Sequence, residues 1–308
     1  MTLKSKFKKR GVLLPFLIPS IIVTIVCCYI PMCGILFAFK DRVNLFIYDP
    51  FEAFVNANWT FEHFSKIFSG DEFLRALGNT LLISFLKIIF VFPLPIVLAI
   101  FICDIKIKWC SKLFQACMYL PYFLSWAVVS GIFMDVLSSY GVVNRLLISL
   151  GIMDNSDPFI WFQEASCFPF LVVFTDAWKG AGYGTIIYIA AIIGINPELY
   201  DATKIDGATK LQRIVHITLP GIKNTIVAMF IFRVCYMMDA GFDQIYTMLT
   251  PALEGKWQII GTYVYNIGIK QANYTFSTAV GVFNSVVALI LILTGNYISK
   301  KFAGRGII

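Results

Sequence analysis

Six long apolar runs constrain the fold of this chain more than any other feature of its sequence. Each approaches or exceeds the roughly 20 residues that an α-helix needs to cross the hydrocarbon core of a bilayer. Because lipid offers no hydrogen-bond partners, a segment that crosses it satisfies its own backbone as a helix. The sequence therefore predicts an all-α integral membrane protein with six transmembrane helices. The runs lie near residues 12–39, 79–102, 113–137, 168–195, 221–240 and 277–298.

Composition agrees with this class of fold. The chain has 58% apolar and 14% charged residues, whereas soluble domains carry roughly a quarter charged residues. The first run is about twice the length of a secretory h-region and is expected to stay in the protein as a span. We expect one transmembrane domain over 12–298, a basic N-terminus over 1–11 and a C-terminal tail over 299–308.

The distribution of basic residues predicts the orientation of the spans. Lysines and arginines gather before the first run, after the second, after the fourth and at the C-terminal end. By the positive-inside rule these segments are cytoplasmic. Both termini are therefore expected in the cytoplasm. The protein is expected to be a multi-pass protein of the cell membrane. The basic excess follows this orientation, so no nucleic-acid partner is expected.

The sequence offers no metal centre or catalytic centre. None of its eight cysteines forms a Cys-x-x-Cys pair, so neither a disulfide nor a zinc site is expected. The two histidines, His63 and His216, lie in separate loops, and the Gly-x-x-x-x-Gly-Lys-Ser/Thr phosphate loop is absent. We therefore expect a non-catalytic chain that binds no metal and no cofactor itself.

An island of charge separates the fourth and fifth runs, and we call residues 196–220 the charged loop. Its residues up to about Ala208 have a mildly amphipathic helical pattern. Gly207 permits a break where a Cβ would hinder, and Pro220 stands where the next helix can begin. The loop is thus predicted to be a short helix, a turn and a second helix. The alternative is a solvated loop whose charges only obey the positive-inside rule.

The spacing within this loop resembles the EAA loop of binding-protein-dependent ABC importers, which reads Glu-Ala-Ala, three residues, Gly, nine residues, Ile-x-Leu-Pro. Here the chain has Asp201-Ala202-Thr203, then Gly207, then Ile217-Thr-Leu219-Pro220. Asp replaces Glu and Thr replaces Ala, while the Gly and the Ile-x-Leu-Pro match. Other stretches resemble the carbohydrate or polysaccharide permease subgroup of Gram-positive bacteria, namely Tyr29–Asp41, Asn79–Ser84, Phe92–Ala99, Tyr119–Trp126, Ile187–Ala191 and Tyr274–Gly281.

This resemblance implies a type I importer built from several proteins. The chain would be one permease subunit, paired with a second permease, a cytoplasmic ATPase dimer and an extracellular solute-binding lipoprotein. ATP and Mg would bind to the ATPase subunits, and the cargo would be a carbohydrate. The charged loop would dock into the ATPases by a helix-in-groove mode. The residues expected to couple to the ATPases are Tyr200, Asp201, Ala202, Thr203, Ile205, Asp206, Gly207, Leu211, Ile217, Leu219 and Pro220.

Ionisable residues inside the apolar runs are candidates for function, because each costs about 2.5–3.5 kcal/mol on insertion scales. The set comprises Lys87, Asp176, Lys179, Arg233 and Asp239. Asp176 and Lys179 are three residues apart on one helix face and can neutralise each other. Arg233 and Asp239 are six apart and are expected to face a pathway or another span. Structural pairing and pore lining both remain open for each residue.

A sugar presents hydroxyls and apolar ring faces, so its path should combine aromatic platforms with polar partners. The predicted pathway residues are Trp126, Asp176, Trp178, Tyr183, Arg233, Tyr236, Asp239 and Asn284. Lipid-facing or packing roles are an equal alternative for any single aromatic residue. Pro121 in the third run and Gly180, Gly182 and Gly184 in the fourth predict irregular helices there.

Two other functions keep the membrane architecture. The same kind of importer could carry an amino acid, a peptide or a polyamine, since intramembrane carboxylates accept a cationic solute. An ATP-independent secondary transporter would need no docking loop. Uptake by the purified chain alone would favour that second alternative.

Overall fold

The computed structural model describes residues 14–41, 43 and 49–303. In this part of the chain every regular element is helical, and one isolated antiparallel bridge joins Lys40 and Trp59. The predicted all-α class is thereby confirmed. Contacts divide the chain into two compact units, one of Met1–Gly70 with Val264–Phe283 and one of Asp71–Tyr263 with Asn284–Ile308. The predicted basic N-terminus, residues 1–11, and the last five residues lie outside the described ranges.

In the first unit, one long apolar helical path precedes two short helices. It consists of α2 (Leu14–Thr24), η1 (Ile25–Tyr29), α3 (Ile30–Met32) and η2 (Cys33–Phe39), and its portion Leu17–Phe39 is long enough to cross a membrane. The short helices are α4 (Pro50–Asn56) and α5 (Glu62–Ile67), and η5 (Asn266–Lys270) belongs to the same unit.

A buried lysine, Lys40, contacts residues of α4 and of the loop before α5. The Lys40 ammonium lies 4.5 Å from the Phe54 ring centroid and 4.2 Å from the Trp59 ring centroid. It donates a hydrogen bond of 2.7 Å to the Ala57 carbonyl. Two aromatic faces and one carbonyl therefore replace the water around this cation.

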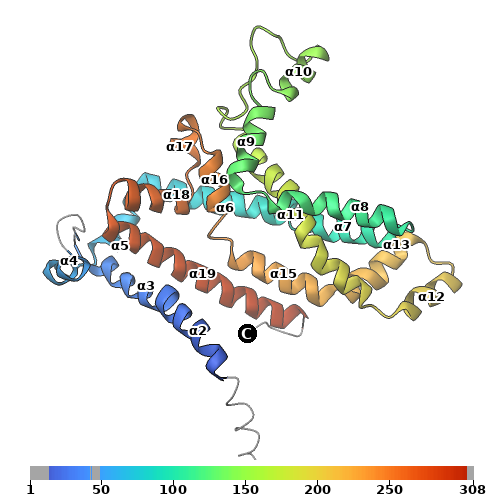
Figure 1. Cartoon of the computed structure of the whole chain (residues 1–308), viewed down its shortest axis with the longest axis horizontal. Coiled ribbons are helices and arrows are strands. Elements are labelled where there is room, and N and C mark those ends of the chain that lie inside the picture. The colour runs from blue at the N-terminus through green and yellow to red at the C-terminus, as the bar shows by residue number, and fades with distance from the viewer. Residues whose placement is uncertain (1–13, 42, 44–48, 304–308) are drawn as a thin grey trace, which may run out of the picture. The chain divides into compact units, whose positions relative to one another are not determined.

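The second unit contains the longer helices (Figure 1). Helices α6 (Asp71–Phe90) and α7 (Pro93–Asp104) form one apolar stretch of 34 residues. Helix α19 (Tyr274–Ala303), whose residues up to Phe283 belong to the first unit and the rest to the second, has a further span-length stretch, Tyr274–Tyr297. The remaining apolar helices occur as three bent pairs. By length and composition the described residues thus hold three spans, or up to six if each bent pair is one span.

The first bent pair occupies the third predicted run, and the longer members of the other two pairs occupy the fourth and fifth runs, while their shorter members lie in the charged loop. The first pair is α8 (Lys108–Tyr119) with η3 (Leu120–Phe123), followed by α9 (Trp126–Val136), with a bend of 102°. The second is α11 (Phe168–Ile193) with α12 (Pro197–Ile205), bent by 71°. The third joins α13 (Lys210–Arg213), η4 (Ile214–Thr218) and α14 (Leu219–Gly221) to α15 (Lys223–Cys235), bent by 64°.

The predicted irregularity is found in one run and not in the other. The helix of the third run breaks around Pro121, as expected for a residue without a backbone N–H. Helix α11, in contrast, runs unbroken through its three glycines, so the prediction for the fourth run is wrong. A Cβ on Gly182 would collide with the Met118 carbonyl, and one on Gly184 would lie 3.0 Å from Pro95 Cγ. These glycines therefore allow close helix packing.

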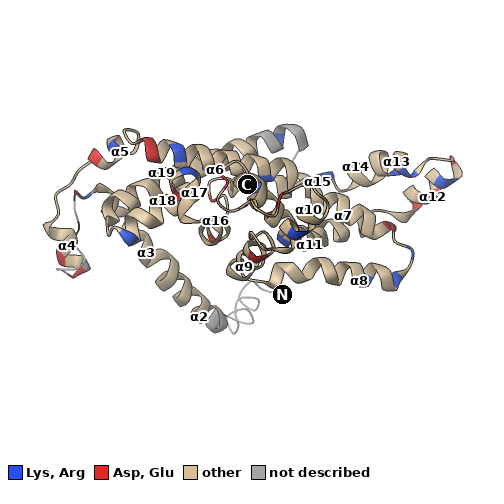
Figure 2. Cartoon of the chain, turned by 90° about the horizontal axis from the view of Figure 1, so that it is seen from above, with Lys and Arg blue, Asp and Glu red and all other residues tan. Residues whose placement is uncertain are grey.

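Shorter helices complete the second unit. They are α10 (Val142–Ser149), α16 (Phe242–Met248), α17 (Pro251–Trp257) and α18 (Ile260–Tyr265). The largest apolar core packs α6, α11, α16 and α17 together, with Ile83, Phe168, Val172, Ile245 and Met248 fully or almost fully buried. A smaller core of Ala99, Tyr188, Ile192 and Ile222 joins α7 and α11 to the start of α15. Figure 2 shows charged residues at the ends of α8, α12 and α13.

Candidate functional site

The charged loop is folded by local hydrogen bonds. The Asn196 side chain accepts from the Glu198 N–H at 3.1 Å and caps α12. After α12 the chain turns at Gly207, whose φ of +70° favours glycine. The Ala208 N–H then donates to the Thr203 carbonyl at 3.0 Å, which closes the C-terminal end of the helix.

The second helical segment begins earlier than predicted. Thr209 and Gln212 form a capping box, in which the Thr209 N–H donates to Gln212 Oε1 at 2.7 Å and the Gln212 N–H donates to Thr209 Oγ1 at 3.3 Å. This box starts α13 at Lys210. Pro220, expected at the helix start, instead follows the π-helical turn η4 within α14. Its missing N–H is compatible with this irregular stretch just before the bend.

Most of the predicted coupling residues project from the loop. Ile205 and Leu211 are 88% and 70% exposed, and Ala202, Asp206 and Pro220 are exposed as well. Ile205 and Leu211 thus present apolar side chains at the surface of the charged loop.

Other residues of the set hold the loop together. The Tyr200 hydroxyl lies 3.0 Å from Thr218 Oγ1 and ties α12 to η4. Asp201 forms an exposed ion pair of 2.8 Å with Lys204, and the Thr203 hydroxyl donates to the Tyr200 carbonyl at 2.9 Å. Ile217 and Leu219 are half-buried. Tyr200, expected to couple to the ATPases, is thus half-buried and bonded within the loop.

A second feature is a partly open cavity of about 450 Å³ in the second unit, which we call the polar cavity. Its walls come from α6, α9, α11, α15 and the segment 236–244. Five of the eight predicted pathway residues line it, namely Trp126, Asp176, Arg233, Tyr236 and Asp239.

A charge network from three helices crosses this cavity. Asp176 Oδ2 of α11 accepts a hydrogen bond of 3.0 Å from Arg233 of α15 and lies 3.4 Å from the Lys87 ammonium of α6. Lys87 also donates to the Ala240 carbonyl at 3.0 Å and to Gln244 Oε1 at 2.6 Å. Asp176 and Arg233 are thus paired and also line the cavity. Structural pairing and pore lining, the two predicted alternatives for these residues, therefore do not exclude each other.

Lys179, a possible neutralising partner of Asp176, forms no ion pair with it among the described residues. Lys179 donates to the carbonyls of Tyr122 and Leu124, each at 2.7 Å. These carbonyls lie at the break between η3 and α9, where the helical hydrogen-bond pattern is interrupted. Lys179 thus supplies hydrogen-bond donors to the free carbonyls at that break. The Asp176 carboxylate pairs with cations of other helices instead.

The fifth predicted run ends sooner than expected, because the chain unwinds after Cys235. Ala240 and Gly241 have φ of +51° and +88°. The Ser84 hydroxyl donates to the Met237 carbonyl, and Lys87 serves the Ala240 carbonyl. Polar side chains of α6 thereby supply partners that an unwound segment at membrane depth requires.

Three predicted pathway residues lie elsewhere. Trp178 packs edge-on against Phe133, with ring centroids 5.4 Å apart, and Tyr183 stacks on Tyr122 at 4.1 Å. Asn284 lies in α19, and its buried Oδ1 has no hydrogen-bond partner among the described residues. None of the three lines the polar cavity.

Among the cavity-lining residues that the sequence-based site set omitted are Lys87, Tyr188 and Gln244. Lys87 could have been included from the sequence alone, since a charged residue within an apolar run is a candidate for function. Gln244 lies beyond the predicted fifth run and is fully buried. No local pattern distinguishes it from an ordinary loop residue.

Helices of membrane-spanning length around a polar cavity, together with a projecting charged loop, are the features of a membrane transport subunit. Residues 79–304 match the family described as "Binding-protein-dependent transport system inner membrane component". The chain belongs to this family, and it is a membrane permease with the fold of a type I ABC importer subunit.

Curated relatives and solved structures match over nearly the whole chain. Protein LplB of Bacillus subtilis (strain 168) is 37% identical over 293 residues, covering 94% of this chain and 89% of its own length. The polygalacturonan/rhamnogalacturonan transport system permease protein YteP of the same organism is 35% identical, covering 94% and 88%. A chain of a bacterial ABC transporter involved in the import of the acidic polysaccharide alginate is 36% identical with a TM-score of 0.86, covering 97% and 99%.

Proposed function

We propose that this chain forms half of the translocation pathway of an ATP-driven importer for an oligosaccharide or a polysaccharide fragment. The polar cavity is the observation that carries the proposal. Relatives named as permeases for polygalacturonan/rhamnogalacturonan and for arabinooligosaccharides support the carbohydrate class. So does the alginate importer, which was solved in complex with a pentasaccharide-bound periplasmic protein.

The cavity has the chemistry that a sugar requires. Trp126 and Tyr236 supply aromatic surface for the apolar ring faces. Arg233 and Asp239 supply donors and acceptors for hydroxyls. The carboxylate of Asp176 is shared between Arg233 and Lys87 and orients both cations.

The charged loop would couple this pathway to ATP. Its exposed Ile205 and Leu211 suit a groove on a cytoplasmic ATPase subunit. Closure of an ATPase dimer would move the loop and switch the cavity between inward and outward access. ATP and Mg would bind to those partners. A second permease would complete the pathway, and an extracellular solute-binding lipoprotein would deliver the cargo.

In this arrangement each bent helix pair contributes one span and the charged loop stays outside the membrane, so that six spans put both termini in the cytoplasm. Two observations support it: the number of candidate spans reaches six when the pairs are merged, and the basic residues gather on one side of the runs.

Two tryptophans offer a matched test of the pathway. Trp126 lines the polar cavity and Trp178 does not. In proteoliposomes with the complete complex, we expect Trp126→Ala to slow uptake of labelled oligosaccharide about tenfold or more, the effect of losing one aromatic platform. Trp178→Ala should transport near the wild-type rate at equal abundance.

Other results would redirect the proposal. Equal loss in both variants would show that the cavity is not the path. Uptake of amino acids, peptides or polyamines, with none of any oligosaccharide, would favour the same architecture with a different cargo.

A further inference from the structure

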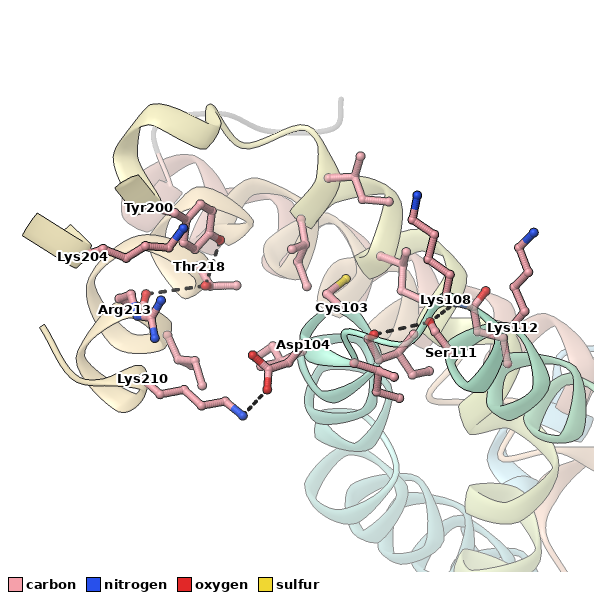
Figure 3. A pocket seen from close by; sticks show the side chains of 18 residues that line it. Cys103, Asp104, Lys108, Ser111, Lys112, Tyr200, Lys204, Lys210, Arg213 and Thr218 are labelled. Atoms are coloured by element: carbon pink, nitrogen blue, oxygen red, sulfur yellow. Dashed lines mark hydrogen bonds and ion pairs between the residues drawn. The ribbon is translucent and has the colours of Figure 1, made fainter. Parts of the chain in front are cut away.

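A second hollow of the same unit lies between the charged loop and the connection of α7 to α8. It has a volume of about 770 Å³, and we call it the basic pocket. In Figure 3, Tyr200, Lys204, Lys210 and Arg213 stand on one wall and Lys108 and Lys112 on the other. The transport pathway described above does not use it.

The pocket has more positive than negative charge. Five cationic side chains line it, Lys108, Lys112, Lys204, Lys210 and Arg213. Lys204 is paired with Asp201, and Lys210 is paired with Asp104. In the described part of the chain the other three have no acidic partner.

One of these cations is incompletely satisfied. The Nε of Arg213 is buried and has no hydrogen-bond acceptor among the residues that the structure describes. A buried donor without an acceptor is costly, and the cost is larger for a charged group. Arg213 therefore has hydrogen-bonding capacity that no described residue uses.

Most of the remaining lining is apolar and leads onto the side of a membrane helix. Ile100, Ile189 and Ile214 are among the isoleucines of the pocket. A smaller groove of about 190 Å³ shares Ile100, Lys210 and Ile214 with it and adds Val97 and Phe101. Val97 and Phe101 are 45% and 60% exposed. From Asp104 to Val97 the groove follows α7 for about 10 Å.

We propose that the basic pocket binds the phosphate headgroup of an anionic phospholipid, with the upper part of an acyl chain in the groove along α7. Cationic pockets between transmembrane helices on the cytoplasmic side bind such headgroups. The apolar groove favours a lipid over a soluble phosphate, because a soluble ion would leave it uncovered. The inference rests on the proposed orientation, in which the charged loop is cytoplasmic.

A lipid there would contact both walls at once. It would link α7 and α8 to α12 and α13, which carry the surface proposed to meet the ATPases. The content of anionic lipid would then tune the coupling between ATP hydrolysis and transport.

The test is lipid retention by the complete complex. The complex is placed in nanodiscs of phosphatidylcholine with a known fraction of phosphatidylglycerol, extracted in detergent, and its retained lipids are quantified by mass spectrometry. We expect phosphatidylglycerol to be enriched over its fraction in the disc. In the variant Lys112→Gln/Arg213→Gln the enrichment should fall about fivefold for each cation removed, the effect of about 1 kcal/mol per basic side chain. The control Lys106→Gln, an exposed lysine outside the pocket, should match the wild type.

Several results would overturn the lipid site. These are no enrichment in the wild type, equal enrichment in the pocket variant, or equal loss in the control. Binding of inorganic phosphate without a preference for phosphatidylglycerol would indicate a soluble anion. Loss of the ATPase subunits from the pocket variant with unchanged lipid retention would assign these cations to the ATPase contact.

Sugar uptake is measured on the same preparations, so that the two proposals fail separately. Enrichment without sugar uptake would keep the lipid site and contradict the proposed function. Sugar uptake without enrichment would support the proposed function and contradict the lipid site.

Discussion

At the scale of single residues, Lys87 connects three different elements around the polar cavity. It is 4% exposed and contacts Asp176, the Ala240 carbonyl and the Gln244 amide oxygen. A buried cation is tolerated when its partners replace water. Here those partners include the unwound segment after α15, so that one side chain both balances a charge and holds a backbone break.

This arrangement predicts a large loss of stability for Lys87→Met. The change leaves a carbonyl and an amide oxygen without a donor, and breaking a buried pair costs about 3–5 kcal/mol. We expect a clear fall in the thermal unfolding midpoint of the detergent-solubilised complex. Lys66→Met is the control, because the ion pair of Lys66 with Glu62 is exposed on both sides and such pairs contribute little. Equal shifts for the two variants would contradict the role given to Lys87.

Gly207 allows a second prediction, which tests the effect of backbone conformation at a position where a side chain would meet no steric clash. No atom within 4 Å would contact a Cβ at this position, but its φ is +70°. A β-branched residue is strained there, whereas asparagine tolerates this region. Gly207→Val should therefore nearly abolish ATP-driven uptake while the protein still inserts into the membrane. Gly207→Asn should retain most of the uptake. Transport by Gly207→Val at the wild-type rate, with equal abundance, would show that this turn is not needed.

At the scale of helices, the glycines of α11 act in packing. Gly182 faces the Met118 carbonyl so closely that a Cβ would collide, while a Cβ on Gly180 would have its nearest contact at 3.9 Å. We predict that Gly182→Ala lowers the yield and thermal stability of the protein, because backbone atoms of α8 would have to move. Gly180→Ala should be neutral or slightly stabilising, since alanine is favoured over glycine in a helix by about 0.5–1 kcal/mol. A folded yield of Gly182→Ala equal to that of Gly180→Ala would refute the packing role.

The helices also show where prediction from sequence succeeded and where it failed. The apolar runs predicted the class of fold, because span length and hydrophobicity are local properties. The capping box at Thr209 and Gln212 is local too, yet the prediction relied on Pro220 and placed the second helix start too late. The end of α15 could not be predicted from its own sequence, since Ser84 and Lys87 of another helix satisfy the unwound carbonyls.

The candidate site was predictable only in part for the same reason. The cost of burying a charge marked Asp176 and Arg233 as notable residues. Helical spacing suggested Lys179 as the partner of Asp176, but the break near Pro121 offers Lys179 two carbonyls. Aromatic identity did not separate Trp126 from Trp178, because the path depends on which face of a helix meets the cavity.

At the scale of the whole molecule, the account joins a cavity, a docking loop and a source of energy outside the chain. Family membership establishes a permease of an importer that depends on a binding protein. Carbohydrate as cargo and ATP as energy source for this chain are the proposed parts.

ATP-dependent uptake by the reconstituted complex tests this central claim most directly. Proteoliposomes carrying both permeases and the ATPases are loaded with Mg-ATP inside and supplied outside with the binding protein and labelled oligosaccharide. The account predicts accumulation of sugar that requires both internal ATP and the binding protein and that is lost in Gly207→Val. Accumulation driven by an ion gradient without ATP, or by this chain alone, would contradict it.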